Sequence, residues 1–292
     1  MTFTILRNLL VILLVFSVLP ARAQAPLPPL QACADQSLQK GLEASLTALN
    51  LDQAVRNKSL CVALVDITDP DSPRLASVNG DNMMYAASLP KIAILLGAFE
   101  RIERGELTLT SDLREKLTRM IRNSSNQAAT EMLNLVGKDY LARLLESPRY
   151  RLYDPTLNGG LWVGKDYGKS SAWKRDPLHN LSHGATAFQV ARFYYLLETG
   201  RLVSPEMSRE MKEILGKPAI HHKFVKGLEQ AGRAAKIYRK SGTWQNFHAD
   251  SGIIEHSGHR YIAVALAKDP AGGQWLSKLI VSLDNLICRP RG

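Results

Sequence analysis

A serine and a lysine three residues apart stand at the expected start of a helix. Ser88 and Lys91 precede an apolar pattern of helical spacing over residues 92–102, which predicts a helix ending at Gly105. Both side chains then share one helix face, beside first-turn amides that can stabilise an oxyanion. A desolvated Lys91 would have a lowered pKa and could take the proton of Ser88 during attack on a carbonyl. The alternative is a helix-capping serine beside a solvated lysine.

Two further motifs carry groups that would complement such a nucleophile. In Ser124-Ser125-Asn126 a hydroxyl could protonate a leaving nitrogen, and the amide of Asn126 could bind a substrate amide. The alternative for this motif is that Ser124 or Ser125 only caps the helix that follows. The second motif, Lys240-Ser241-Gly242-Thr243, lies on a predicted strand. It offers a positive charge, a close backbone approach at the glycine and a terminal hydroxyl. The alternative, which the motif in isolation favours, is an exposed lysine beside a strand bulge.

The elements that must position these motifs predict an α+β fold. A helix over residues 34–49 and strands at 60–67 and 74–78 open the folded part, and strands near 236–243, 251–256 and 261–267 precede a last helix at 274–287. We therefore expect an antiparallel β-sheet flanked by N- and C-terminal helices, built from residues 31–80 and 215–292. An inserted all-α lobe spans residues 81–214, and the cleft between the two parts is the expected site.

In this order, Ser-x-x-Lys, Ser-x-Asn and Lys-Ser/Thr-Gly resemble the serine β-lactamase and penicillin-binding protein superfamily, especially the class A β-lactamases. The resemblance extends over most of the chain. It implies that Ser88 is the nucleophile, Lys91 its base or proton relay, and Ser124 the proton donor. It also implies that Asn126 binds a substrate amide, that Lys240 and Thr243 bind a substrate carboxylate beside Ser241 and Gly242, and that the amides of Ser88 and Thr243 form the oxyanion hole.

The segment Asp154 to Asn158 resembles the class A Ω-loop pattern Glu-Pro-x-Leu-Asn, with aspartate in place of glutamate. The resemblance implies that Asp154 and Asn158 hold the deacylating water. An aspartate carboxylate falls short by roughly 1.5 Å, which costs on the order of a hundredfold in rate. An ordinary Asp-Pro turn is the alternative.

Two other features separate the chain from the class A pattern. Ser88 and Ser124 are only 36 positions apart, which predicts that a loop walling one side of the cleft is missing. Residues 159–180 form a long glycine-rich stretch that resembles an insertion able to rebuild this wall. Its aromatic residues, Trp162, Tyr167 and Trp173, suit ligand contact, and packing against the helical lobe is the alternative.

The N-terminus predicts export. Residues 1–23 combine Arg7, an apolar run and Ala21-Arg22-Ala23, as a cleaved secretory leader does, and residues 24–30 form a proline-rich spacer before the catalytic part, residues 31–292. Without the leader the chain stays basic, at about +8 against +10 for the whole sequence. A leader argues against nucleic acid as the partner. We expect a periplasmic or secreted monomer with no stable membrane anchor, acting on a small β-lactam or a peptidoglycan peptide.

Three cysteines occur. Cys33 and Cys288 are predicted to form a disulfide if the terminal helices pack antiparallel, and Cys61 to be a buried free thiol. No ligand spacing predicts a metal site or another cofactor, and His221-His222-Lys223 is interpreted as a solvated cluster. A serine triad using His248 and Asp250 is a less economical alternative.

Three hypotheses of function remain open. The first is an exported hydrolase that acylates Ser88 with a β-lactam and deacylates it slowly through water near Asp154. The second is a D-Ala-D-Ala peptidase acting on peptidoglycan. The third is a protein that binds penicillin or wall fragments without turnover.

Overall fold

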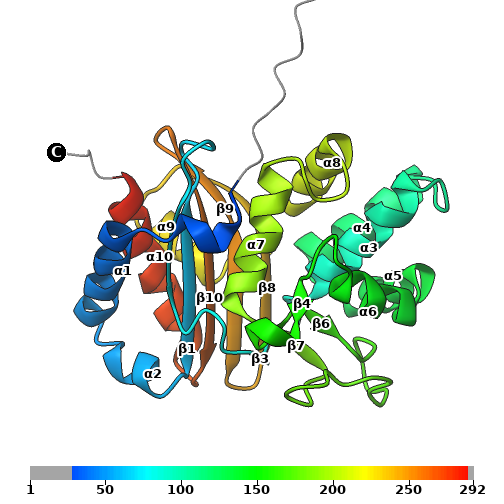
Figure 1. The fold of residues 1–292 in the computed structure, drawn as a ribbon, viewed down its shortest axis with the longest axis horizontal. Coiled ribbons are helices and arrows are strands. Elements are labelled where there is room, and N and C mark those ends of the chain that lie inside the picture. Colours follow the sequence, from blue (N-terminus) through cyan, green and yellow to red (C-terminus); the bar gives the residue numbers. More distant parts are fainter. Residues whose placement is uncertain (1–27, 289–292) are drawn as a thin grey trace, which may run out of the picture.

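In a computed structural model that describes residues 28–288, a five-stranded antiparallel sheet forms the centre (Figure 1). Its strand order is β2-β1-β10-β9-β8. The bounds are Leu60–Asp66 for β1, Arg74–Val78 for β2, Lys236–Trp244 for β8, Phe247–His256 for β9 and His259–Lys268 for β10. The predicted α+β class with a central antiparallel sheet is therefore confirmed.

Strand β1 explains why the sheet lies inside the molecule. Its residues are apolar apart from the last, and all seven are buried, as expected for a strand covered on both faces. It pairs with β2 at the edge and with β10 on the other side, with Ala63 opposite Ser77 and Val264. The sheet thus joins strands from the two ends of the chain.

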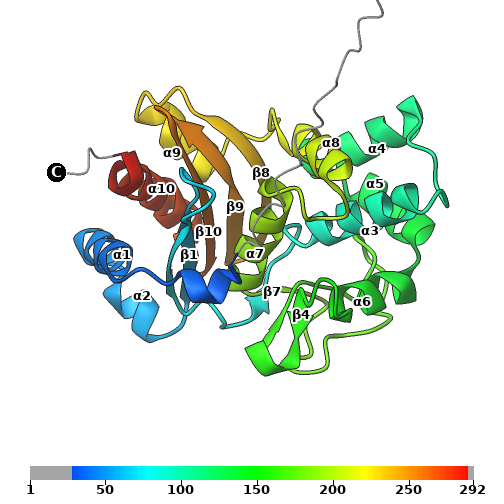
Figure 2. The same ribbon diagram turned by 45° about the horizontal axis from the view of Figure 1, so that its top comes forward.

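Terminal helices cover one face of the sheet, as predicted (Figure 2). Apolar residues of both helices and of the sheet share one core cluster that includes Leu42, Ala263 and Leu279. The bounds of the helices on this side are Gln36–Ala48 for α1, Asp52–Arg56 for α2, Phe224–Gln230 for α9 and Gly272–Cys288 for α10.

Helix α7, Ala187–Glu198, covers the opposite face of the sheet and packs against β1 and β10. Its residues Val190 and Phe193 belong to the same core cluster as Ala63 and Val264. The predicted boundary of the helical lobe at residues 81–214 is therefore wrong for α7, because its apolar side is buried against the sheet.

The inserted lobe is mainly helical, but it is not all-α. It contains a small sheet of order β3-β7-β6 and the pair β4-β5. The strands are β3 (Met84–Tyr85), β4 (Tyr153–Asp154), β5 (Gly159–Gly160), β6 (Trp162–Val163) and β7 (His183–Ala185). The helices are α3 (Lys91–Glu103), α4 (Ser111–Arg122), α5 (Asn126–Val136), α6 (Lys138–Glu146) and α8 (Pro205–Leu215). The 3-10 helix η2 is Pro155–Leu157.

The predicted disulfide is wrong. Cys33, Cys61 and Cys288 are all free thiols, as predicted only for Cys61. Cys33 lies in the 3-10 helix η1, Leu30–Cys33, before α1 begins, and belongs to the core cluster on the α7 side of the sheet. Cys288 ends α10 on the opposite side, so the packing of α1 against α10 does not bring the two sulfurs together.

The predicted leader, residues 1–23, lies outside the described residues. The spacer was predicted to reach residue 30, but Leu30 is buried and begins η1. Within residues 28–288, no helix has both the length and the apolar character needed to cross a bilayer.

Candidate active site

Ser88 lies in the turn that leads into α3. The preceding residue, Ala87, has φ +50°, and the amide of Leu89 donates to the carbonyl of Ala86 at 3.0 Å. This tight turn leaves Ser88 partly exposed at a cavity of about 680 Å³. We call it the Ser88 cavity; its lining includes Tyr85, Ser88, Asn126, Lys165, Asp166, Tyr167, Ser182, His183, Thr243, Trp244 and Phe247.

Lys91 is fully buried at the first residue of α3. Its Nζ donates to the carbonyl oxygen of Ser124 at 2.6 Å and to Oδ1 of Asn126 at 2.8 Å. The ring of Tyr167 covers the amine, with 4.6 Å between Nζ and the ring centroid. Burial lowers the pKa of Lys91 to about 7, so a large fraction is neutral near neutral pH and can accept a proton.

The hydroxyl of Ser124 lies between two amines. Nζ of Lys240 donates to its Oγ at 2.9 Å, and Nζ of Lys91 lies 3.4 Å from the same oxygen. The backbone at Ser124 has φ +56°, while the neighbouring Ser125 caps α5 by accepting from the amide of Ala128. The capping alternative is thus right for Ser125, and it leaves Ser124 free to act as a proton donor.

Strand β8 delivers the third motif to the same place. Lys240 is fully buried; burial, reinforced by the charge of Lys91, holds its pKa well below the ordinary value. A Cβ atom at Gly242 would lie 2.1 Å from the carbonyl oxygen of Ala86, so only glycine lets β8 pass this close to the Ser88 turn. The exposed-lysine alternative is therefore wrong.

Ser241 and Thr243 differ in their surroundings. The Oγ of Ser241 contacts Nε2 of His222 at 3.1 Å, whereas Thr243 lines the Ser88 cavity. Its hydroxyl accepts from Nζ of Lys223 at 2.7 Å, and this amine also donates to the carbonyl oxygen of Gly242.

Lys223 is a site residue that the sequence interpretation missed. It is buried, and burial lowers its pKa to about 8, so the description of residues 221–223 as solvated holds only for the exposed His221. The amide of Phe224 donates to Oδ2 of Asp250, which fixes this segment beside β9. Nothing in the local sequence indicates this contact, because residues 223 and 243 meet only through the packing of α9.

The alternative triad finds no support in this geometry. Both carboxylate oxygens of Asp250 accept hydrogen bonds from the guanidinium of Arg239, at 2.7 and 2.8 Å. The two ring nitrogens of His248 are buried and have no hydrogen-bond partner among the described residues. Asp250 therefore neutralises a buried arginine and does not orient a histidine.

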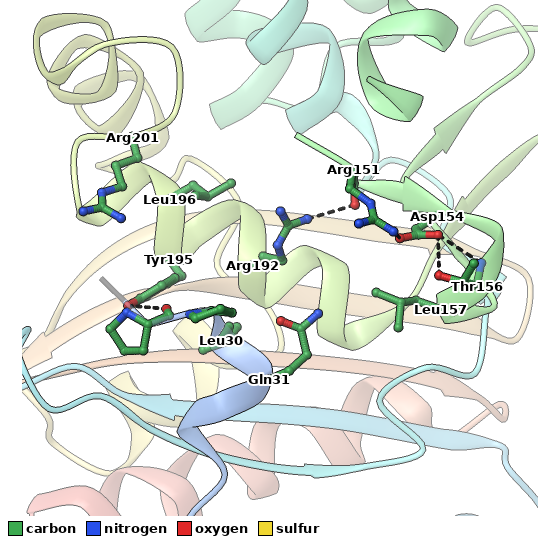
Figure 3. Close-up of a pocket in the computed structure, with 12 residues that line it drawn as sticks. Leu30, Gln31, Arg151, Asp154, Thr156, Leu157, Arg192, Tyr195, Leu196 and Arg201 are labelled. Carbon is green, nitrogen blue, oxygen red and sulfur yellow. Dashed lines mark hydrogen bonds and ion pairs between the residues drawn. The ribbon is translucent and has the colours of Figure 1, made fainter. Parts of the chain in front are cut away.

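Asp154 and Asn158 do not lie in the Ser88 cavity. Asp154 lines a separate cavity of about 430 Å³ between α7 and η2, where Nη2 of Arg151 lies 2.7 Å from its carboxylate (Figure 3). Its Oδ1 accepts from the amide and the hydroxyl of Thr156, at 3.0 and 2.7 Å. Asn158 donates to the carbonyl of Asp81.

The predicted position of the Ω-loop pair beside Ser88 is therefore wrong, and the turn alternative describes this segment. The physical reason is that Asp154 caps η2. Burial alone would raise its pKa, but the hydrogen bonds from Thr156 and the charge of Arg151 together lower it. A carboxylate held this way is a poor base.

The glycine-rich stretch does wall the cavity, as predicted. Tyr167 lines the cavity. Trp162 is instead buried against Tyr153, with 4.8 Å between the ring centroids, so the alternative of packing inside the protein is correct for Trp162. Trp173 also packs against the core. The sequence interpretation missed His183, whose Nε2 contacts the carbonyl of Lys165 and whose pKa burial lowers to about 4.

The three motifs thus meet around one cavity, with Ser88 in its lining and the buried amines of Lys91 and Lys240 on the hydroxyl of Ser124. The sequence matches the beta-lactamase enzyme family over residues 43–116 and 110–288. The chain belongs to this family, in agreement with the resemblance of its motifs. No curated protein matches the chain.

Solved structures show the same fold at low sequence identity. The beta-lactamase from Sphaerobacter thermophilus DSM 20745 has a TM-score of 0.67 at 18% identity, covering 87% of this chain and 99% of that one. PBP-A has a TM-score of 0.63 at 18% identity, covering 88% and 97%. A beta lactamase from Xanthomonas campestris pv. campestris str. ATCC 33913 gives 0.64 at 16% identity, covering 85% and 98%.

Proposed function

We propose that the protein forms an acyl-enzyme at Ser88 by opening a β-lactam or a related cell-wall amide. The observation that carries this proposal is the convergence of Lys91 and Lys240 on the hydroxyl of Ser124. Lys91 also donates to Asn126, which lines the same cavity as Ser88. Three segments far apart in the sequence supply these groups, and together they provide a nucleophile, a base and an acid.

The reaction follows from these positions. The neutral amine of Lys91 takes the proton of Ser88 as its Oγ bonds to the carbonyl carbon, and the backbone amides of Ser88 and Thr243 stabilise the oxyanion. When the carbon–nitrogen bond breaks, Ser124 donates its proton to the nitrogen, and Lys91, which now carries the proton of Ser88 and lies 3.4 Å from Oγ of Ser124, returns a proton to Ser124.

The cavity also favours an anionic substrate. Thr243 lines the cavity, and its hydroxyl accepts from Lys223, whose pKa of about 8 leaves the amine largely protonated at neutral pH; this charge is suited to a carboxylate. Because Oδ1 of Asn126 already accepts from Lys91, the NH2 group of that amide is left to donate to a substrate carbonyl. Export to the periplasm or medium belongs to the same proposal, supported by the leader-like residues 1–23.

A second candidate, a peptidase with a long-lived acyl-enzyme, is favoured by the surroundings of Lys91. The Asp154 carboxylate lies in another cavity, and the ring of Tyr167 covers the Lys91 amine where a hydrolytic water would be activated. A solved structure similar in fold, a PBP-A mutant, is an acyl-enzyme complex with penicillin G. Slow deacylation would suit transfer to a peptide amine better than β-lactam hydrolysis.

Incubation of the mature protein with a chromogenic cephalosporin, followed by absorbance and intact mass, tests the proposal. Sustained colour release supports the hydrolase, and one burst with a lasting mass increase on Ser88 supports the peptidase. Ser88→Ala should lose both signals. If wild type shows neither signal while it remains folded, the protein is a binding module and the proposal is wrong.

A further inference from the structure

A histidine, an aspartate and a cysteine converge where the end of α10 meets β9, on the side of the sheet away from the Ser88 cavity. Nδ1 of His256 lies 3.0 Å from Oδ1 of Asp284, and Sγ of Cys288 lies 3.6 Å from each of these atoms. Asp284 is buried, while His256 and Cys288 are partly exposed. We propose that these three side chains bind a zinc-like divalent cation.

The distances suit one tetrahedral ion. Zinc bonds of about 2.3 Å to sulfur and 2.0–2.1 Å to nitrogen or oxygen place tetrahedral ligands about 3.6 Å apart for sulfur with nitrogen or oxygen. For nitrogen with oxygen the separation is about 3.4 Å. The two observed distances from Sγ of Cys288, both 3.6 Å, match this geometry. The distance of 3.0 Å between Nδ1 of His256 and Oδ1 of Asp284 would have to increase by a few tenths of an ångström. Solvent at the partly exposed edge would supply the fourth ligand.

The surrounding groups orient the ligands as a metal site requires. Nε2 of His256 contacts Oγ of Ser257 at 3.1 Å, so the proton can reside on Nε2 and leave Nδ1 as a lone pair. Tyr261 donates to Oδ1 of Asp284 at 3.0 Å and fixes the carboxylate. The second carboxylate oxygen, Oδ2, is buried and has no hydrogen-bond partner among the described residues; Nε of Arg233 lies 3.4 Å away.

Among the described residues, hydrogen bonds leave one polar atom of this cluster, Oδ2 of Asp284, without a partner. The single thiol proton of Cys288 faces two acceptors at equal distance, and a third, the carbonyl of His256, at 3.8 Å. A cation satisfies all three side chains at once. On binding, the Sγ–metal bond forms as the thiol proton leaves to solvent; the thiolate and carboxylate offset the charge of the dication, and Arg233, beside Oδ2 of Asp284, keeps its own positive charge.

Titration of the untagged mature protein with Co2+ and Zn2+ tests the site. One equivalent of Co2+ should produce the thiolate-to-metal absorption band of tetrahedral coordination, and Zn2+ should bleach it. Cys288→Ser should abolish the band, whereas the matched control Cys33→Ser should keep it. No band in folded wild type, or a band that persists in Cys288→Ser, would overturn the proposal.

A second measurement on wild type needs no variant. Alkylation with iodoacetamide, mapped by peptide mass, should slow at least tenfold at Cys288 when one equivalent of Zn2+ is present, with no change at Cys33. Equal alkylation of Cys288 with and without Zn2+ would contradict the metal site. Neither result depends on whether Ser88 is acylated.

Discussion

The Nζ of Lys240 and the Oγ of Ser124 lie 2.9 Å apart, which ties the last part of the sheet to the loop before α5. This contact joins the sheet to the helical lobe. In the mechanism we propose, Ser124 passes a proton to the departing nitrogen, and the contact with Lys240 holds its hydroxyl in position.

Replacing Ser124 by alanine should therefore slow acylation by about 10²-fold or more, because general acid catalysis contributes about that much. Rates of adduct formation with a chromogenic cephalosporin measure the effect. Ser125→Ala is the matched control: it removes the α5 cap and should lower stability by about 1 kcal/mol with acylation unchanged. Equal acylation rates in wild type and Ser124→Ala would remove Ser124 from the mechanism.

The acylation rate should rise with pH and level off above an apparent pKa of about 7. Burial lowers the pKa of Lys91 to about 7, so the amine is protonated and inactive as a base below that pH and neutral above it. Second-order acylation rates between pH 5 and 9 test this. A rate that is flat across pH 7, or that falls as pH rises through it, would exclude the neutral amine as the base.

Asp154→Asn should leave the lifetime of the acyl adduct unchanged, because the carboxylate lies in a separate cavity with Arg151 and Thr156. The mass of the adduct followed over time gives the lifetime. Asp154→Ala should lower the free energy of unfolding by about 1 kcal/mol, since it removes the cap of η2. A prolonged adduct in Asp154→Asn would restore this residue to deacylation.

Tyr167→Ala should shorten the lifetime of the adduct about tenfold, because losing the ring admits water beside Lys91. Tyr167→Phe is the control that keeps the ring and should behave as wild type; the phenol hydroxyl has no hydrogen-bond partner among the described residues. If the alanine variant deacylates at the wild-type rate, the ring does not limit hydrolysis.

Gly242→Ala should lower the free energy of unfolding by about 1–3 kcal/mol and reduce acylation, because the new Cβ meets the carbonyl of Ala86 and displaces the Ser88 turn. Denaturant unfolding and adduct formation measure the two effects. Gly273→Ala is a suitable control, since a Cβ there meets no atom closer than 3.4 Å. Retention of wild-type stability in Gly242→Ala would show that β8 can move away from the turn.

The sequence determined the order of the three motifs and the class of the fold. The spacing of Ser88 and Lys91 predicted that both lie at the start of one helix; in the structure Ser88 lies in the turn before α3 and Lys91 is the first residue of that helix. The strands over residues 236–268 are rich in β-formers, so their identity was also accessible, with ends shifted by a few residues.

Tertiary packing decided which charged groups reach the site. Residues 154–158 resemble the Ω-loop motif apart from aspartate in place of glutamate, yet the carboxylate of Asp154 turns to Arg151 and Thr156, because local hydrogen bonds fix the loop. Lys223 and Thr243 meet only because the residue before α9 lies beside β8 and β9. Likewise, Cys288 contacts His256 through the packing of α10, while Cys33 lies across the sheet. Such contacts depend on three-dimensional distance, which spacing in the chain does not encode.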